Sequence, residues 1–97
     1  MNNQADNFNK VMLNELVPQK KIFIVAIDSA RAAAYALKNM LRKHQWSYVV
    51  DVDNLKGLRD VEIHFVGEWY KHRNYYEIAA ETDRMKALGR ATLHFVD

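Results

Sequence analysis

The sequence predicts a ferredoxin-like α+β fold with the element order βαββαβ. Segments with strand-like and helix-like hydrophobic periodicity alternate in that order along residues 21–97. The first strand segment is apolar on both faces, as a central strand is, and a turn sequence between the second and third strand segments indicates a hairpin. We therefore expect a four-stranded antiparallel sheet in the spatial order 4-1-3-2, with both helices covering one of its faces.

Length and composition favour a single domain. The chain has 97 residues with one proline and three glycines, and typical domains contain roughly 100–150 residues. We expect the domain to span residues 21–97 behind an N-terminal arm, residues 1–20. A short helix that ends before Pro18 is expected in the arm, because apolar residues recur there at helical spacing: Phe8, Val11, Met12 and Leu16.

The domain begins with a strand that leads into a helix. Residues 21–27 are apolar and rich in β-branched side chains, which predicts a buried strand. Asp28 then offers a side-chain oxygen that caps a helix, and residues 30–44 contain no glycine, proline or β-branched residue to interrupt it. The inward face of this helix is expected to carry Ala30, Ala33, Ala34, Leu37, Met40 and Leu41.

The remaining elements are two strands, a helix and a last strand. Residues 46–53 and 61–66 alternate with period two and flank turn residues 54–57, which predicts a hairpin. Residues 74–88 begin with a capping pattern and form a helix, and residues 91–96 close the sheet. The inward face of the second helix is expected to carry Tyr75, Ile78, Ala79, Thr82, Met85 and Leu88.

The residue types present argue against most catalytic chemistry. Without cysteine the chain has no disulfide, no thiolate metal site and no thiol nucleophile, and its isolated glycines form no phosphate loop. His64 and His94 are expected on strands that flank a common neighbour, about 9–10 Å apart, which is too far to share a metal ion. We expect no metal and no cofactor, and we favour a non-catalytic binding module.

Basic and aromatic residues indicate RNA, or another polyanion, as the partner. The net charge is only +2, but one exposed stripe of the first helix is expected to carry Arg31, Tyr35, Lys38 and Arg42, with Lys43 at its end. A second basic segment interleaves aromatic rings: Trp69, Tyr70, Lys71, Arg73 and Tyr76. We expect these two regions to bind RNA. Binding across the sheet is disfavoured, because its expected outer face carries acidic residues.

Two other functions remain open. The same aromatic segment would suit an interaction module that inhibits or adapts a larger protein, as small regulators encoded by mobile elements do. In addition, residues 24–28, a strand that ends in Asp28, resemble the small dimeric ferredoxin-like ribonucleases of the CRISPR-adaptation and virulence-associated protein D families. That resemblance implies a metal ion held by Asp28 of each subunit.

A homodimer and a cytoplasmic location complete the expectations. The outer sheet face is expected to expose a partly apolar patch, through which two copies would associate: Phe23, Val25, Val49, His64, Val66 and Val96. The sequence shows neither a signal-peptide pattern nor a run of about 20 apolar residues that could span a membrane. We therefore expect an intracellular, cytoplasmic protein without membrane contact.

Overall fold

The computed structural model describes residues 20–96 of the chain. Its strands are β1 (Ile22–Val25), β2 (Trp46–Tyr48), β3 (Val61–Val66) and β4 (Ala91–Val96), and its α-helices are α2 (Ser29–Lys38) and α3 (Tyr75–Ala87). The 3₁₀ helices are η1 (Lys43–Gln45), η2 (Val52–Leu55) and η3 (Trp69–Lys71). The expected N-terminal arm, residues 1–20, lies outside the described residues except for Lys20.

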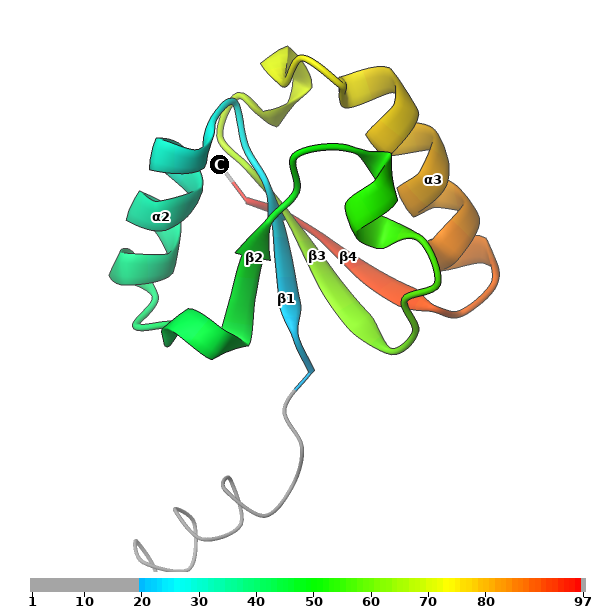
Figure 1. Cartoon of the computed structure of the whole chain (residues 1–97), viewed down its shortest axis with the longest axis horizontal. Coiled ribbons are helices and arrows are strands. Elements are labelled where there is room, and N and C mark those ends of the chain that lie inside the picture. Colours follow the sequence, from blue (N-terminus) through cyan, green and yellow to red (C-terminus); the bar gives the residue numbers. More distant parts are fainter. Residues whose placement is uncertain (1–19, 97) are drawn as a thin grey trace, which may run out of the picture.

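The strands form one sheet in which every pairing is parallel, in the order β2-β1-β3-β4 (Figure 1). The predicted ferredoxin-like antiparallel sheet, with the order 4-1-3-2, is therefore wrong, although its four strands and two α-helices are present. The predicted hairpin is absent because β2 and β3 lie on opposite sides of β1. Residues 49–60 instead form a crossover, for which about a dozen residues suffice.

Polar side chains end β2 early and begin this crossover. The Asn54 side-chain oxygen accepts hydrogen bonds from the backbone N–H groups of Val50 and Asp51, at 2.8 and 3.1 Å. The Asp51 carboxylate accepts one from the N–H of Asp53 at 2.9 Å and caps η2. The residues predicted to extend the strand to Asp53 and to turn a hairpin thus build a capped 3₁₀ helix.

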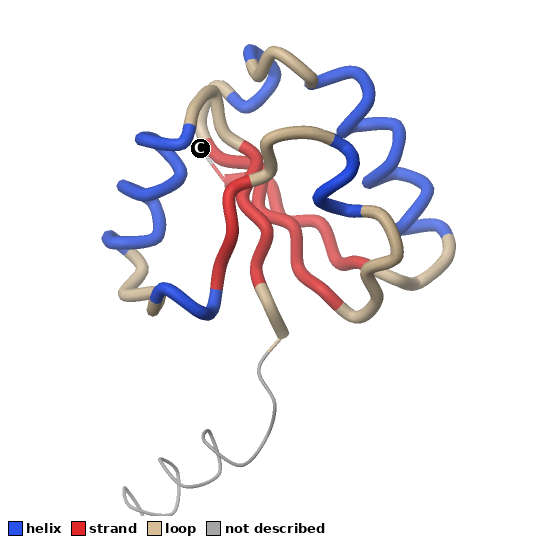
Figure 2. Tube along the Cα trace, in the orientation of Figure 1, coloured by secondary structure: helices blue, strands red, loops and turns tan. Residues whose placement is uncertain are grey.

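The helices lie on both faces of the sheet (Figure 2), rather than on one face as predicted. α2 lies over β1 and β2 and reaches β3 at Val66, while α3 and η2 cover the opposite face. The strand order explains this arrangement, because the chain leaves β1 in one direction along the sheet and leaves β3 in the other. Right-handed crossovers in opposite directions place their helices on opposite faces.

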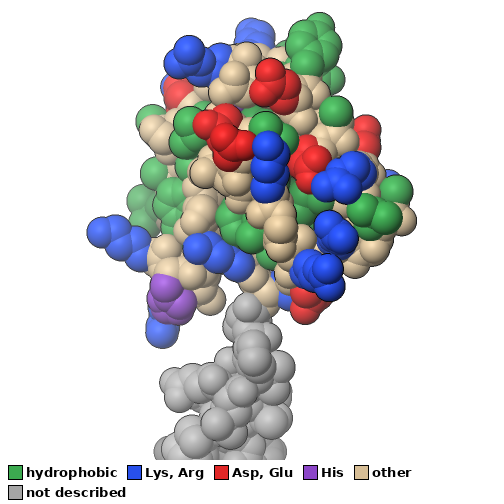
Figure 3. All heavy atoms as spheres, turned by 45° about the vertical axis from the view of Figure 1, so that its right-hand side comes forward, with side chains coloured by type: hydrophobic (Ala, Val, Ile, Leu, Met, Phe, Trp, Pro, Cys, Tyr) green, Lys and Arg blue, Asp and Glu red, His purple; other side chains and the backbone are tan. Residues whose placement is uncertain are grey.

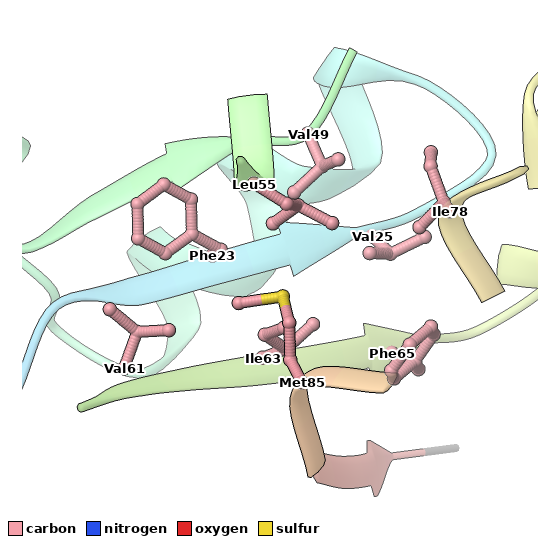
Figure 4. Packing of buried hydrophobic residues seen from close by; sticks show 9 residues of the cluster. All are labelled: Phe23, Val25, Val49, Leu55, Val61, Ile63, Phe65, Ile78 and Met85. Atoms are coloured by element: carbon pink, nitrogen blue, oxygen red, sulfur yellow. The ribbon is translucent and has the colours of Figure 1, made fainter. Parts of the chain in front are cut away.

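Each covered face has its own apolar core. The larger core lies beneath α3 and η2 (Figure 4) and contains Phe23, Val25, Val49, Leu55, Val61, Ile63, Phe65, Ile78 and Met85. The smaller core lies beneath α2 and contains Ile24, Ala26, Ala32 and Ala36. The patch predicted to be open for dimerisation is thus partly filled, because Phe23, Val25 and Val49 are buried.

α2 ends at Lys38, earlier than the predicted end at residue 44. Met40 adopts a left-handed conformation with φ 56°, and the N–H of Leu41 returns to the carbonyl of Ala36 at 2.9 Å. This bond closes the helix end as a Schellman motif does. Residues 42–44 therefore belong to a loop and to η1.

The predicted inward faces are wrong for α2 and partly confirmed for α3. On α2, Ala32 and Ala36 are buried, whereas Leu37 and Met40 are 81% and 88% exposed. Small alanine side chains allow the helix to lie close to the sheet. On α3 the predicted burial is confirmed for Ile78, Thr82 and Met85, whereas Leu88 is 54% exposed. Within residues 20–96, no helix combines the length and apolarity that a membrane span requires.

Candidate functional site

The residues of the predicted basic stripe do not share one helix face. Arg31 lies in the first turn of α2 and pairs with Asp28, with Nη1 to Oδ2 at 3.0 Å. The Tyr35 hydroxyl turns toward β3 and lies 2.7 Å from Nδ1 of His64. Lys38 ends the helix, Arg42 follows in the next loop, and Lys43 begins η1. The stripe is thereby divided between the two ends of α2.

Asp28 caps α2, as predicted. Its Oδ1 accepts a hydrogen bond from the backbone N–H of Arg31 at 2.9 Å, and its Oδ2 accepts one from the Arg31 guanidinium. Both carboxylate oxygens therefore have partners within the chain. The ribonuclease resemblance implied a ferredoxin-like fold, and the parallel sheet removes that basis for a metal at Asp28.

The aromatic segment lies at the other edge, where the strands end. Trp69 contacts the rings of Phe65, Tyr75 and Phe95, with centroids 5.1, 5.4 and 5.5 Å away. Among the predicted contact residues, Tyr70 and Tyr76 are 53% and 85% exposed. Trp69 thus packs against the domain, and the two tyrosines present their rings to solvent.

Charged residues near the aromatic segment neutralise one another. Lys71 pairs with Glu68 at 2.6 Å, while Arg73 is exposed. The hydrogen bond from Lys71 holds the pKa of Glu68 below its usual value, and the charge of Arg31 lowers it further. Of the two basic residues of the aromatic segment, Lys71 is therefore compensated, and Arg73 alone has no ion pair within residues 20–96.

Positive charge gathers where the strands begin. The register pairs Ile22 with both Trp46 and Glu62, and Val61 with Ala91, so the residues that precede each strand meet at one edge. The C-terminal end of α2 reaches the same edge because the helix runs antiparallel to the strands. We call this set the basic edge: Lys20, Lys21, Lys38, Arg42, Lys43, Arg59 and Arg90.

Few carboxylates oppose the basic edge. Among residues 20–96, Lys20 is its one member in an ion pair, with Asp60 at 3.2 Å. Arg90 lies near Glu81, whose pKa is lowered chiefly by its hydrogen bond with Arg84 and to a lesser degree by Lys56 and Arg90. Figure 3 shows several Lys and Arg side chains along the lower part of the domain, where few Asp or Glu side chains are seen, and further Lys and Arg side chains among the acidic ones above.

A second cluster lies on the half of the sheet that α2 leaves open. Glu62 and His64 project from one face of β3, and His94 is the register partner of His64 on β4. Glu62 Oε1 lies 3.0 Å from Nε2 of His64 and 3.3 Å from Nε2 of His94. The predicted separation of the two histidines is wrong, because β4 lies beside β3.

Tyr35 connects this cluster to α2. Its hydroxyl contacts Nδ1 of His64, and the two rings meet edge to face with centroids 5.7 Å apart. Burial raises the pKa of Tyr35, and the Glu62 carboxylate raises it further. Four titratable side chains are thus connected across α2, β3 and β4. The Glu-x-His spacing on β3 was visible in the sequence, but its proximity to His94 depended on the strand order.

No protein-family model matches the chain, and neither curated proteins nor solved structures show significant similarity to it.

Proposed function

We propose that the protein binds a polyanion, with single-stranded RNA as the favoured ligand, through the basic edge. The observation that carries this proposal is the convergence of basic residues from every strand entry at one edge of the parallel sheet. Phosphate groups gain affinity from such clusters by releasing counterions. The proposal retains the partner expected from the sequence but moves the principal contact away from the aromatic segment.

Ordinary helix electrostatics does not explain the basic edge. Basic residues are favoured in the last turn of a helix by the macrodipole, and that effect is sufficient for Lys38. It does not apply to Lys20, Lys21 or Arg59, which precede strands. Lys20 is paired with Asp60, but the remaining like charges that this position brings together repel one another, which costs free energy unless an anion compensates them.

The test compares two charge reversals of equal size at opposite edges. Arg42→Glu with Lys43→Glu alters the basic edge, and Lys71→Glu with Arg73→Glu alters the aromatic segment. Binding of a labelled RNA of about 16 nucleotides is followed by fluorescence anisotropy over a range of salt concentrations. We expect the first variant to bind the RNA at least about ten-fold more weakly. The slope of the logarithm of the binding constant against the logarithm of the salt concentration should become less steep by about 1.4, since two phosphate contacts are lost.

The matched variant distinguishes the possible outcomes. Equal weakening by both variants would show a response to net charge alone and would contradict the proposal. Weakening only in the Lys71 and Arg73 variant would place the RNA at the aromatic segment. An unmodified chain that does not bind RNA at low salt would overturn the proposal entirely.

A second candidate function is protein–protein interaction, with a second copy of the chain as the partner. β4 is an edge strand, and residues 91–96 contain no lysine, arginine or proline that would discourage strand pairing. Phe95 adds an aromatic ring that is 62% exposed. Antiparallel pairing of two β4 strands about a two-fold axis would cover both features.

This interaction is tested by light scattering coupled to gel filtration. The unmodified chain is expected to elute as a dimer, and Thr92→Lys, which places a charge on the exposed edge strand, should shift it to the monomer. Thr92→Ser is the matched control. A monomeric mass for the unmodified chain at high concentration would contradict the interaction.

A further inference from the structure

We propose that Glu62, His64 and His94 form a binding site for a divalent transition-metal ion, with Zn²⁺ favoured by the donor set. The ligand atoms are Glu62 Oε1 and the Nε2 atoms of the two histidines, and all three lie within 4.8 Å of one another. The site is independent of RNA binding, since it lies on the open sheet face and not at the basic edge.

Two of the three distances in the cluster resemble those between the ligands of a bound zinc ion, and the third pair of ligand atoms lies within 4.8 Å. Metal–ligand bonds of about 2.0–2.1 Å in a tetrahedron place neighbouring ligand atoms about 3.3 Å apart. Glu62 Oε1 lies 3.0 Å from Nε2 of His64 and 3.3 Å from Nε2 of His94. Small rotations of the three side chains would therefore suffice for Glu62 and the two histidines to bind one metal ion in place of their hydrogen bonds to each other.

The donor types select for zinc among common ions. Two imidazoles and one carboxylate are the protein ligands of many open zinc sites, in which a water molecule takes the fourth position. Magnesium and calcium prefer oxygen ligands throughout. The side chains of His64, Glu62 and His94 are 13%, 31% and 44% exposed, so the site is anchored at His64 and accessible at His94.

Tyr35 is the positioning residue for His64. A histidine that binds a metal through one ring nitrogen usually has the other nitrogen held by a hydrogen bond. The Tyr35 hydroxyl lies 2.7 Å from Nδ1 of His64, on the side of the ring away from Glu62. When Nε2 binds the metal, Nδ1 carries the ring proton, and the Tyr35 hydroxyl oxygen can accept a hydrogen bond from this N–H group.

The rigid strands also preorganise the site. Glu62 and His64 are two residues apart on β3, so the pleat places them on the same face. His94 is aligned with His64 by the register of six residue pairs between β3 and β4. The backbone positions of all three ligands are therefore fixed by one strand pairing, without loops.

The alternative explanation is a hydrogen-bonded network that only stabilises the sheet. Isothermal titration of the untagged full chain with Zn²⁺ distinguishes the two explanations, with Mg²⁺ as the control ion. We expect one zinc ion per chain in the micromolar range, a higher melting temperature with zinc, and no response to Mg²⁺. No saturable zinc binding by the unmodified chain would overturn the proposal.

Variants assign the binding to the three residues. His94→Ala and Glu62→Gln should each weaken zinc binding at least about ten-fold, and Tyr35→Phe should do so by about ten-fold. The matched control is His44→Ala, because His44 is exposed in η1, away from the cluster. Melting without zinc is measured for every variant, so that loss of the fold is separated from loss of the site. Equal zinc affinity in His94→Ala and in the unmodified chain would contradict the assignment.

Discussion

His64 and His94 are register partners on the adjacent parallel strands β3 and β4, and their ring centroids lie 4.8 Å apart. Their Nε2 atoms approach the same carboxylate oxygen, Oε1 of Glu62. This meeting depends on β4 lying beside β3. In the antiparallel order 4-1-3-2, β1 would separate the two strands, and the histidines would be distant.

A cross-link between these positions tests the strand order. His64→Cys combined with His94→Cys should form a disulfide on mild oxidation, because adjacent strands lie about 4.8 Å apart and disulfides span Cα distances of about 4.4–6.8 Å. The natural chain contains no cysteine, so loss of free thiols in chains that remain monomeric on non-reducing gels reports this bond alone.

The matched pair is Tyr48→Cys with His64→Cys. Both positions are aligned with Ile24, from opposite sides of β1. Their backbones are therefore about 9.6 Å apart, beyond the reach of a disulfide, and this pair should remain reduced. In the order 4-1-3-2, by contrast, the second and third strands would be neighbours. A disulfide between positions 48 and 64, with none between positions 64 and 94, would therefore contradict the parallel sheet.

The sequence was sufficient to place the elements but not their directions. The central position of β1 followed from its apolar faces. The polar alternation of Glu62 and His64 on β3 is typical of an antiparallel sheet with one open face. Here it arises because α2 covers β1, β2 and only the end of β3 at Val66, and leaves the rest of β3 and β4 open on that face. Residues 49–60 likewise carry turn residues that suit either a hairpin or a crossover, and local chemistry does not distinguish between them.

The end of α2 offers a stabilising substitution. Met40 has φ 56° and is 88% exposed, so it carries backbone strain and has little packing to lose. Met40→Gly should raise the free energy of unfolding by about 0.5–1 kcal/mol, because glycine adopts this conformation without a Cβ clash. Urea unfolding followed by tryptophan fluorescence measures the change.

Leu37→Gly is the comparison for this substitution. Leu37 is also highly exposed but lies within the helix, where glycine costs about 1 kcal/mol. Opposite signs for the two variants are expected. If Met40→Gly lowered the stability instead, the Met40 side chain would have to be buried, as the apolar pattern of the sequence predicted.

The start of α2 depends on the cap formed by Asp28. Asp28→Ala removes the hydrogen bond to the N–H of Arg31 and should cost about 1 kcal/mol of unfolding free energy. Asp28→Asn keeps a side-chain oxygen at the same place and should cost less. Equal losses in urea unfolding would show that the ion pair with Arg31, and not the cap, supplies the stabilisation.

The candidate sites were less predictable than the elements. The cap role of Asp28 follows from local sequence, and it is confirmed. The Glu62, His64 and His94 cluster and the basic edge combine residues from different strands, so they become visible only once the strand order is known. Tyr35 was assigned to an exposed stripe, because helical spacing does not show that its hydroxyl turns toward β3.

Alkaline pH should weaken the domain through Tyr35. Burial and the nearby Glu62 raise its pKa above the ordinary value of 10.0. The folded chain then holds the phenolic proton more tightly than the unfolded chain, so the free energy of unfolding falls as the pH rises above about 10. Urea unfolding at several pH values should show a smaller fall in Tyr35→Phe than in the unmodified chain. Parallel pH profiles for the two proteins would contradict this linkage.

The last prediction concerns His72, a buried residue to which the sequence assigned no structural role. Its Nδ1 accepts a hydrogen bond from the N–H of Asn74 at 2.9 Å. Nε2 therefore carries the ring proton and donates a hydrogen bond to the carbonyl of Val49 at 2.8 Å. The Asn74 side chain donates to the carbonyl of Val50 at 2.9 Å. The neutral imidazole thus joins the start of α3 to the end of β2.

His72→Ala should lower the free energy of unfolding by about 2–4 kcal/mol, since it leaves a cavity and two buried backbone groups without partners. The control is His44→Ala, at an exposed position, with an expected change within about 0.5 kcal/mol. Urea unfolding of both variants gives the comparison. Trp69 packs on Tyr75 independently of the imidazole. Similar small losses of unfolding free energy in both variants would therefore show that these aromatic contacts, and not His72, hold the loop before α3.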